Sequence, residues 1–249
     1  MIKHAMLAHK YKPSKHNIVG WLMSEKLDGV RAIWDGKDFW SRNMKAITAP
    51  KWFKSKMPEQ LILDGELWAG RGNFQQLIST VRKHRPIDHE WEFVTYKAFD
   101  CPMLKGTFEE RLPFVPLLHR HIHTPVGSAS HLQFCFDTIV SNGGEGLMLK
   151  NPRCQYEQGR SHNLLKLKPE LTGLAIVVGY VPGLGKYEGM IGSLNCIGDG
   201  YAEFDVGSGL TDDQRLSIHA FHGKRIQFSY QELTRDDVPR FPVFVRVLE

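Results

Sequence analysis

One short stretch, Lys26-Leu27-Asp28-Gly29-Val30-Arg31, carries most of the information about this chain. It places an aspartate, a glycine and an arginine at fixed spacing after a lysine. Taken alone, the stretch is also compatible with a surface Asp-Gly turn flanked by charges. Whether this stretch is a surface turn or part of a functional site therefore depends on the motifs that follow it along the chain.

Charged motifs follow this lysine in a definite order. They are Ser41-Arg42-Asn43, Asp64-Gly65-Glu66, Tyr96-Lys97-Ala98-Phe99-Asp100, Glu145-Gly146-Leu147-Met148-Leu149-Lys150 and Lys166-Leu167-Lys168-Pro169. Together they supply amines, carboxylates and arginines, which are the groups that phosphoryl transfer requires. The joint pattern is far more specific than any one of its parts.

In this order the motifs resemble those of the covalent nucleotidyltransferases, a superfamily of ATP-dependent DNA ligases, RNA ligases and mRNA capping enzymes. A closer resemblance, to the minimal DNA ligases called Lig E, is carried by Ser24-Glu25-Lys26 and by residues 63–77, 183–194 and 240–246. It implies an ATP-dependent DNA ligase that seals nicks between a 5′-phosphate and a 3′-hydroxyl in duplex DNA. The alternatives are an RNA ligase or capping-type enzyme that uses the same lysine, and a nucleic-acid-binding module with an inactive nucleotide pocket.

The resemblance implies that Lys26 attacks the α-phosphate of ATP and carries AMP as a lysyl-AMP. An amine attacks only when it is neutral, a form that burial and neighbouring cations favour. Lys166, Lys168 and Arg31 are the cations expected near it. Because Lys166 and Lys168 are two residues apart in a strand-like segment, both are expected on one strand face, where they reach the same phosphate. A solvated strand face is the alternative.

The nucleotide and metal contacts are implied in the same way. Glu66 and Glu145 are expected to hold a divalent metal, Mg²⁺ or Mn²⁺, and Glu66 alternatively contacts the ribose. Phe99 is expected to stack on adenine, and Ser24 and Glu25 are expected to line the nucleotide site. Exposed glutamates and ordinary core packing of the phenylalanine are the alternatives.

Two arginines are expected to contact nicked DNA. The resemblance makes Arg42 a clamp on the 5′-phosphate, and it places Arg31 on a phosphate or sugar beside the nick. A planar guanidinium binds phosphate through two parallel hydrogen bonds. Surface salt bridges are the alternative for both residues.

The end of the chain departs from the pattern of larger ligases, which finish with Arg-x-Asp-Lys. This chain ends Arg246-Val247-Leu248-Glu249, so Arg240 or Arg246 would have to orient the leaving pyrophosphate. His119, His121 and His123 alternate along the chain without cysteine or acidic partners nearby, which favours a polar surface over a metal site.

Composition sets the broad class. The chain has 249 residues, of which 42% are hydrophobic and 24% charged, as in ordinary globular proteins. No apolar run approaches the ~20 residues of a membrane span. Four irregularly spaced cysteines without a C-x-x-C pair predict reduced thiols. Since no signal peptide is visible, we expect a cytoplasmic or phage-encoded protein, and a monomer.

The positive charge is concentrated in the first two thirds. Residues 1–169 contain 25 Lys and Arg against 16 Asp and Glu, whereas residues 170–249 contain 7 against 11. Clustered lysines and arginines attract phosphates, so DNA is expected to bind mainly to the first part.

The expected fold is α+β. Residues 1–170 are expected to form a nucleotidyltransferase (adenylation) domain of antiparallel sheets with flanking helices. Residues 171–249 predict an OB-fold β-barrel, with an SH3-like barrel as the alternative. The helical segments are 74–81, by its i, i+3, i+4, i+7 pattern, 132–140, 212–221, and one starting at Ala49-Pro50 with Thr48 as its N-cap. The strand-like segments are 31–34, 61–63, 91–98, 147–149, 164–168, 174–180, 190–197, 201–206, 225–230 and 243–248.

Overall fold

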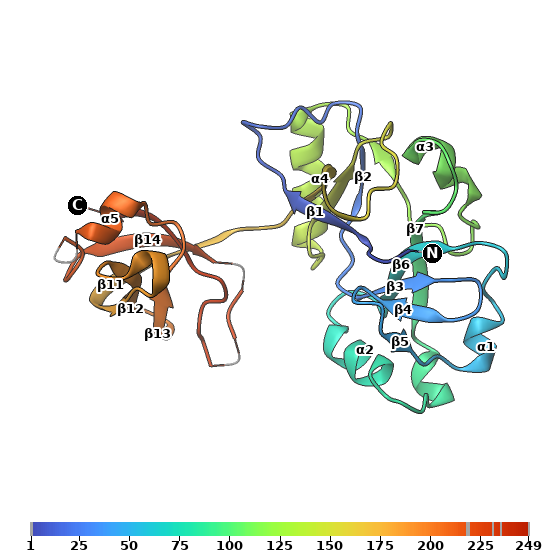
Figure 1. Ribbon diagram of the computed structural model, residues 1–249, viewed down its shortest axis with the longest axis horizontal. Coiled ribbons are helices and arrows are strands. Elements are labelled where there is room, and N and C mark those ends of the chain that lie inside the picture. The colour runs from blue at the N-terminus through green and yellow to red at the C-terminus, as the bar shows by residue number, and fades with distance from the viewer. Residues whose placement is uncertain (1, 218–219, 231, 235, 249) are drawn as a thin grey trace. The chain divides into compact units, whose positions relative to one another are not determined.

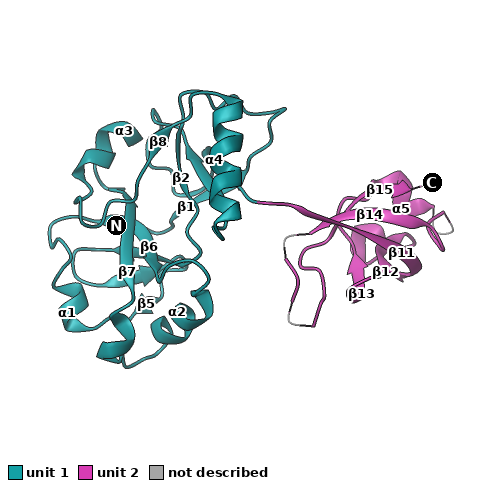
Figure 2. Cartoon of the chain, turned by 180° about the vertical axis from the view of Figure 1, so that it is seen from behind, with its two compact units in different colours: residues 1–168 teal, residues 169–249 magenta. Residues whose placement is uncertain are grey.

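The structure, a computed structural model, describes residues 2–217, 220–230, 232–234 and 236–248. The chain divides into two compact units, Met1–Lys168 and Pro169–Glu249 (Figure 2). The boundary expected after residue 170 lies two residues from this division. The two units have separate hydrophobic cores.

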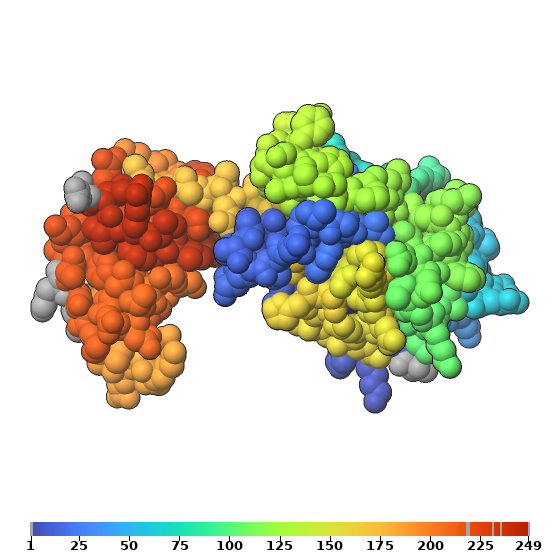
Figure 3. All heavy atoms as spheres, turned by 90° about the horizontal axis from the view of Figure 1, so that it is seen from above, coloured from blue at the N-terminus to red at the C-terminus, as the bar shows by residue number. Residues whose placement is uncertain are grey.

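The first sheet of unit 1 carries Lys166 and adjoins Lys26 and Lys168. Its order is β1 (Met6–Lys10), β10 (Gly159–Leu167), β9 (Leu147–Lys150), β2 (Leu22–Glu25) and β8 (Thr124–Pro125). The strands pair antiparallel, except that β1 runs parallel to β10. Figure 3 shows these two segments side by side. Helix α4 (Ala129–Ser141) covers one face, where Leu132 packs with the buried side chains of β2 and β9.

The second sheet of unit 1 carries the acidic motif. Its order is β5 (Ala46–Ile47), β4 (Phe39–Ser41), β3 (Val30–Trp34), β6 (Leu63–Trp68) and β7 (Thr95–Asp100), all antiparallel. Helices α1 (Lys51–Lys54) and α2 (Phe74–Val81) pack on it (Figure 1), and the 3₁₀ helix Asp88–Trp91 places Trp91 in the same core. The predicted helix over 74–81 is confirmed, because its apolar period of 3.6 residues points Leu77 and Val81 into this core.

Short elements link the two sheets. Helix α3 (Phe108–Arg111) begins with a capping box between Thr107 and Glu110 and continues as the 3₁₀ helix Leu112–Phe114. No helix among the described residues is long and apolar enough to cross a membrane. All four cysteines are free thiols, as expected, and three of them are buried.

Unit 2 forms a third sheet. Its order is β13 (Tyr201–Val206), β12 (Ile191–Gly198), β11 (Leu171–Pro182), β14 (Arg225–Tyr230) and β15 (Val243–Leu248). A parallel bridge between Ser208 and Val243 draws the two edges together, as in a partly open barrel. The 3₁₀ helix Gly185–Tyr187 lies in the β11–β12 connection, and α5 (Asp212–Leu216) follows β13.

The structure corrects several expected boundaries. Thr48 is not an N-cap: Pro50 is the N-cap of α1, and the helix begins at Lys51. β6 begins at Leu63, and the segment predicted as a strand from residue 91 becomes one at Thr95. Helix α5 ends at Leu216, so the predicted helix is too long; its residues 218–219 lie outside the described residues.

Candidate active site

The two sheets of unit 1 enclose a cavity of about 250 Å³. Most of the residues singled out in the sequence line it: Ser24, Glu25, Lys26, Arg31, Arg42, Glu66, Phe99 and Lys166. They come from β2, β3, β6, β7 and β10 and from the ends of β2 and β4. Segments distant in the sequence therefore meet at one cavity because two sheets face it.

Lys26 lies one residue beyond β2 and is held by an acidic partner. Its Nζ donates a short hydrogen bond to one carboxylate oxygen of Glu145, while Nζ of Lys168 forms an ion pair with the other oxygen. The Lys26 and Glu145 side chains are 23% and 21% exposed, so the pair remains accessible to a ligand. Glu145 thus joins the first lysine motif to the last.

A glycine makes this arrangement possible. The backbone N–H of Lys26 donates to the carbonyl of Gly146 over 2.8 Å. Gly146 has φ of 133°, and a Cβ there would lie 2.2 Å from the carbonyl oxygen of Leu167. Only glycine tolerates both the conformation and the close approach. The Glu-Gly pair therefore brings Glu145 between Lys26 and Lys168, which lies one residue beyond β10 and not in the strand predicted for it.

Lys166 adds a third amine beside this pair. It lies opposite Met148, which in turn lies opposite Ser24, so the three residues form a row across β10, β9 and β2. Burial, with the ammonium groups of Lys168 and Lys26, lowers the pKa of Lys166. A cluster of amines that repel one another in this way is suited to an anionic ligand.

Glu66 faces the same cavity from the second sheet. Burial raises its pKa to about 7, although the charges of Arg31 and Lys26 favour the carboxylate. A Cβ on Gly29 would lie 2.4 Å from the carbonyl oxygen of Leu67 and 2.7 Å from Cγ of Glu66. The glycine of the first motif therefore lets β6 approach closely enough to place this glutamate.

The donor set fits a magnesium-type cation. No cluster of three or more His, Cys, Asp or Glu side chains suited to a metal occurs among the described residues. The cavity instead offers Glu66, which interacts electrostatically with nearby Glu145. Mg²⁺ is commonly held by one or two carboxylates together with the phosphates of its substrate. Two carboxylates near a cavity lined by lysines and arginines fit this mode of magnesium binding.

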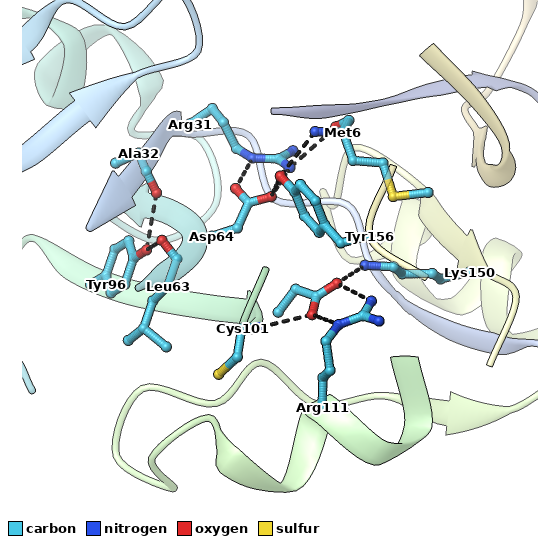
Figure 4. Close-up of polar contacts among 11 residues, drawn as sticks. Met6, Arg31, Ala32, Leu63, Asp64, Tyr96, Cys101, Arg111, Lys150 and Tyr156 are labelled. Atoms are coloured by element: carbon cyan, nitrogen blue, oxygen red, sulfur yellow. Dashed lines mark hydrogen bonds and ion pairs between the residues drawn. The ribbon is translucent and has the colours of Figure 1, made fainter. Parts of the chain in front are cut away.

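Arg31 is anchored by a buried aspartate. Its Nε and Nη2 each donate to Asp64 over 2.6 Å, and the hydroxyl of Tyr156 donates to the same carboxylate over 2.6 Å (Figure 4). Burial disfavours the charge of Arg31, but Asp64 outweighs it and raises the pKa of the guanidinium. The guanidinium carbon lies 4.5 Å from the centre of the Phe99 ring. Arg31 is thus a fixed cation within the cavity.

Beyond Phe99, β7 ends in a second buried network. Asp100 accepts hydrogen bonds from Arg111 over 2.8 and 3.0 Å and a short one from Lys150. The two donors, Arg111 and Lys150, are labelled in Figure 4. Both cations lower the pKa of Asp100 against the opposing effect of its burial. The Nζ of Lys150 lies 4.0 Å from the centre of the Phe108 ring. Phe99 therefore sits between two ion networks that fix its strand.

Ser24 and Glu25 take different positions. The Ser24 side chain is buried at the cavity wall. The Glu25 carboxylate is bound by Arg71, whose Nε and Nη2 donate over 2.7 and 2.9 Å. A nucleotide contact by that carboxylate would have to compete with this pair.

Arg42 lies at the exposed edge of the cavity. It follows β4 in a tight turn, in which the N–H of Lys45 donates to Oγ of Ser41 over 3.1 Å and Met44 has φ of 56°. The exposed guanidinium is available to an incoming ligand.

Sequence reasoning missed four residues at the same cavity: His121, His123, Lys150 and Arg160. The alternating histidines were predicted to be a polar surface, which is wrong. His119 is 8% exposed, and the rings of His121 and His123 hydrogen-bond to the carbonyls of Glu25 and His121 over 2.8 and 2.9 Å. The alternation itself was the available signal, since it places these rings on one side of an extended segment.

The two C-terminal arginines lie in unit 2. Arg240 pairs with Glu232, and Nε of Arg246 donates to Gln227 over 2.9 Å. Both are surface contacts, and the assignment of either to pyrophosphate stays a prediction.

Two family models match the chain. Residues 5–168 match the ATP dependent DNA ligase domain, and residues 182–247 match the DNA ligase OB-like domain. The expected α+β adenylation domain and OB-like domain are thereby confirmed. The alternative of an RNA ligase or capping enzyme gains no support from the comparisons.

Relatives that are named DNA ligases support the same assignment. A DNA ligase of Haemophilus influenzae is 34% identical over 97% of this chain and 91% of its own length. A DNA ligase of Halobacterium salinarum is 28% identical over 78% of this chain, which spans 41% of that longer protein.

Among solved structures, one from a structure–function analysis of Lig E DNA ligases, concerned with DNA binding by a minimal scaffold, is 32% identical. It has a TM-score of 0.82 and covers 100% of both chains. A Chlorella virus DNA ligase-adenylate, 22% identical with a TM-score of 0.58, shares the fold. The ATP dependent DNA ligase domain model matches more than half of this chain, and a relative is 34% identical over 97% of it. This chain therefore belongs to the ATP-dependent DNA ligases and is similar to Lig E.

Proposed function

We propose that this ligase seals nicks in duplex DNA through three transfers that begin at Lys26. In the first, the neutral Nζ attacks the α-phosphorus of ATP. An N–P bond forms, the bond from that phosphorus to the β-bridging oxygen breaks, and pyrophosphate leaves. Glu145, which already accepts the hydrogen bond of Nζ, is the carboxylate positioned to take the proton. The juxtaposition of Lys26 and Glu145 carries this proposal.

The cations and the aromatic ring of the cavity would hold the nucleotide. Lys166, Lys168 and Arg31 bind its phosphates, and Phe99 stacks on adenine. Because the Arg31 guanidinium covers one face of the ring, the base would use the other face. Glu66 and Glu145 would hold a divalent cation. Their oxygen donors favour Mg²⁺, and the charge of the cation would neutralise the phosphate oxygens.

The second and third transfers involve the nick. An oxygen of the DNA 5′-phosphate attacks the AMP phosphorus, and the N–P bond breaks to return the amine of Lys26. The 3′-hydroxyl oxygen then attacks the 5′-phosphorus, loses its proton, and releases AMP. Arg42, exposed at the cavity edge, would hold the 5′-phosphate through both steps. We further propose that a monomer suffices; a cytoplasmic location and a phage origin stay predictions.

The test is the mass of the intact protein after exposure to ATP, with and without a chelator. The wild-type protein should gain one AMP, and chelator should prevent the gain. Lys26→Arg keeps a cation beside Glu145 but should gain none, whereas Lys45→Arg, at an exposed lysine, should gain AMP normally. AMP on the Lys26→Arg protein would overturn the assignment.

A second measurement separates the substrates. The adenylated protein should transfer AMP to nicked DNA and seal it. Sealing of nicked RNA but not of nicked DNA would contradict the proposal.

A further inference from the structure

His121 lies at the wall between two cavities of unit 1. It lines the cavity that contains Lys26 and a neighbouring one of about 390 Å³, and Ser24, Glu25 and Leu27 also line both. Its segment runs along β7: the N–H of Ala98 donates to His119 over 2.7 Å, and that of His121 donates to Ala98 over 2.8 Å. The ring is therefore held next to the strand that carries Phe99.

One hydrogen bond fixes which ring nitrogen of His121 carries a hydrogen. Nε2 lies 2.8 Å from the carbonyl oxygen of Glu25, and a carbonyl only accepts, so Nε2 carries the hydrogen. Burial lowers the pKa of His121 against the favourable effect of Glu25, and the cation of Lys97 adds to the lowering. In the neutral ring, Nδ1 is a lone-pair acceptor.

Nδ1 is also open to a ligand. No hydrogen bond to it is found within the described residues, and the buried polar side-chain atoms without partners in that part of the chain are Trp91 Nε1 and Arg215 Nε. Nδ1 is not among them, so it has accessible surface, and the residue lines both cavities. Because His121 shares the wall of the Lys26 cavity with Phe99 and Glu25, an accessible acceptor on its ring is suited to a hydrogen-bond donor on the ligand.

We propose that His121 selects adenine over guanine by accepting a hydrogen bond from the 6-amino group of the base through Nδ1. This inference rests on the proposed function, which places the base on Phe99 and the α-phosphate at Lys26. Adenine presents a donor at position 6, whereas guanine presents a carbonyl oxygen. An oxygen facing the Nδ1 lone pair leaves two acceptors unpaired, and sites built to hydrogen-bond one group reject its analogue on this ground.

The test measures how efficiently Lys26 takes up a nucleoside monophosphate from each of three nucleotides. They are ATP, purine riboside triphosphate, which lacks the 6-amino group, and GTP. The wild-type protein should use ATP about tenfold more efficiently than the 6-deamino analogue, the value of one hydrogen bond, mainly through KM. In His121→Phe the ratio of the efficiency with ATP to that with the analogue should fall to about one, because the variant binds ATP more weakly and the analogue as before. Discrimination against GTP should also relax. His121→Asn, which retains a donor and an acceptor, should recover part of the preference.

His119→Phe is the matched control. It removes a ring-to-carbonyl hydrogen bond of similar geometry, from Nε2 to Lys56 over 3.0 Å, outside the cavity. It should leave the preference for ATP over the analogue unchanged. If His121→Phe weakens ATP and the analogue equally, the inference is wrong and the proposed function stands. If the wild-type protein accepts none of the three nucleotides, the proposed function itself fails.

Discussion

At the scale of single residues, Glu66 shows how burial raises the pKa of a carboxyl group that we propose binds a metal. Its pKa of about 7 means that it is largely protonated below neutrality and ionised above it. A bound cation favours the ionised form, so the same group can release a proton when the metal enters. The charges of Arg31 and Lys26 alone do not overcome the cost of burying the Glu66 carboxylate.

This raised pKa gives a stability prediction for Glu66→Gln. The folded state holds the proton more tightly than the unfolded chain, so the wild-type protein loses stability as pH rises from about 4.5 through 7. A glutamine does not ionise. The Tm difference, variant minus wild type, should therefore be near zero at pH 5 and positive at pH 8 in metal-free buffer. Glu92→Gln, at an exposed site, should show no such trend; a flat difference for Glu66→Gln would contradict the raised pKa.

The proposed role of Arg42 predicts different effects on the separate steps of the reaction. Its exposed position at the cavity edge suits the DNA phosphate rather than the buried nucleotide. Arg42→Ala should slow the sealing of nicked DNA by roughly 10- to 100-fold, the range of a charged hydrogen bond, and leave self-adenylation nearly unchanged. Single-turnover rates of the two steps would measure this. Lys45→Ala, in the same turn, is the control, and equal losses in both steps would refute the role.

At the scale of elements, the ion network at the end of β7 connects both sheets and α3. Asp100 and Arg111 are fully buried, and Lys150 is 5% exposed. Removing the one acid leaves two buried cations without their partner. The network therefore makes the position of Phe99 depend on three separate elements.

Asp100→Asn should lower the free energy of unfolding by about 3–5 kcal/mol, as breaking a buried ion pair does. Asp38→Asn, which breaks the more exposed pair with Lys54 at 2.8 Å, should cost less than about 1 kcal/mol. Urea unfolding of both variants at pH 7 measures the contrast. Similar costs for the two would show that the network does not stabilise the fold.

At the scale of the whole molecule, charge is divided between the parts of the chain. The excess of lysine and arginine lies in residues 1–169, while the rest has more acidic than basic residues. A DNA backbone should bind chiefly through the basic part, where each phosphate contact releases a counterion.

Binding of nicked DNA should therefore depend steeply on salt. With about six phosphate contacts, affinity should fall on the order of 10³-fold between 50 and 200 mM salt. Fluorescence anisotropy with nicked duplex would give the slope of log K against log salt. Arg42→Ala should reduce that slope by about one, whereas Glu92→Gln should not change it. Affinity that is independent of salt would rule out this mode of binding.

Local pattern determined much of the fold. The helix at 74–81 follows from its apolar period of 3.6, and the strands of unit 2 follow from short strand-like segments such as the apolar run at 174–180. These segments lie within a few residues of their predicted bounds. The predicted helix from Thr48 and the long helix after Thr211 are wrong at their ends. Termini depend on caps and on contacts beyond the local window.

The sequence by itself named most of the charged residues that line the cavity, because amines, carboxylates and arginines in that order have few other uses. The tertiary structure decided which of them meet. Lys26 and Glu145 are 119 positions apart, and Asp64 and Tyr156 are 92 apart, so no local pattern encodes their contacts. In the tertiary structure, His121 is not the surface residue expected from the sequence but lies at the cavity wall, where burial lowers its pKa. Burial and partners set such charges, and both exist only once the two sheets face each other.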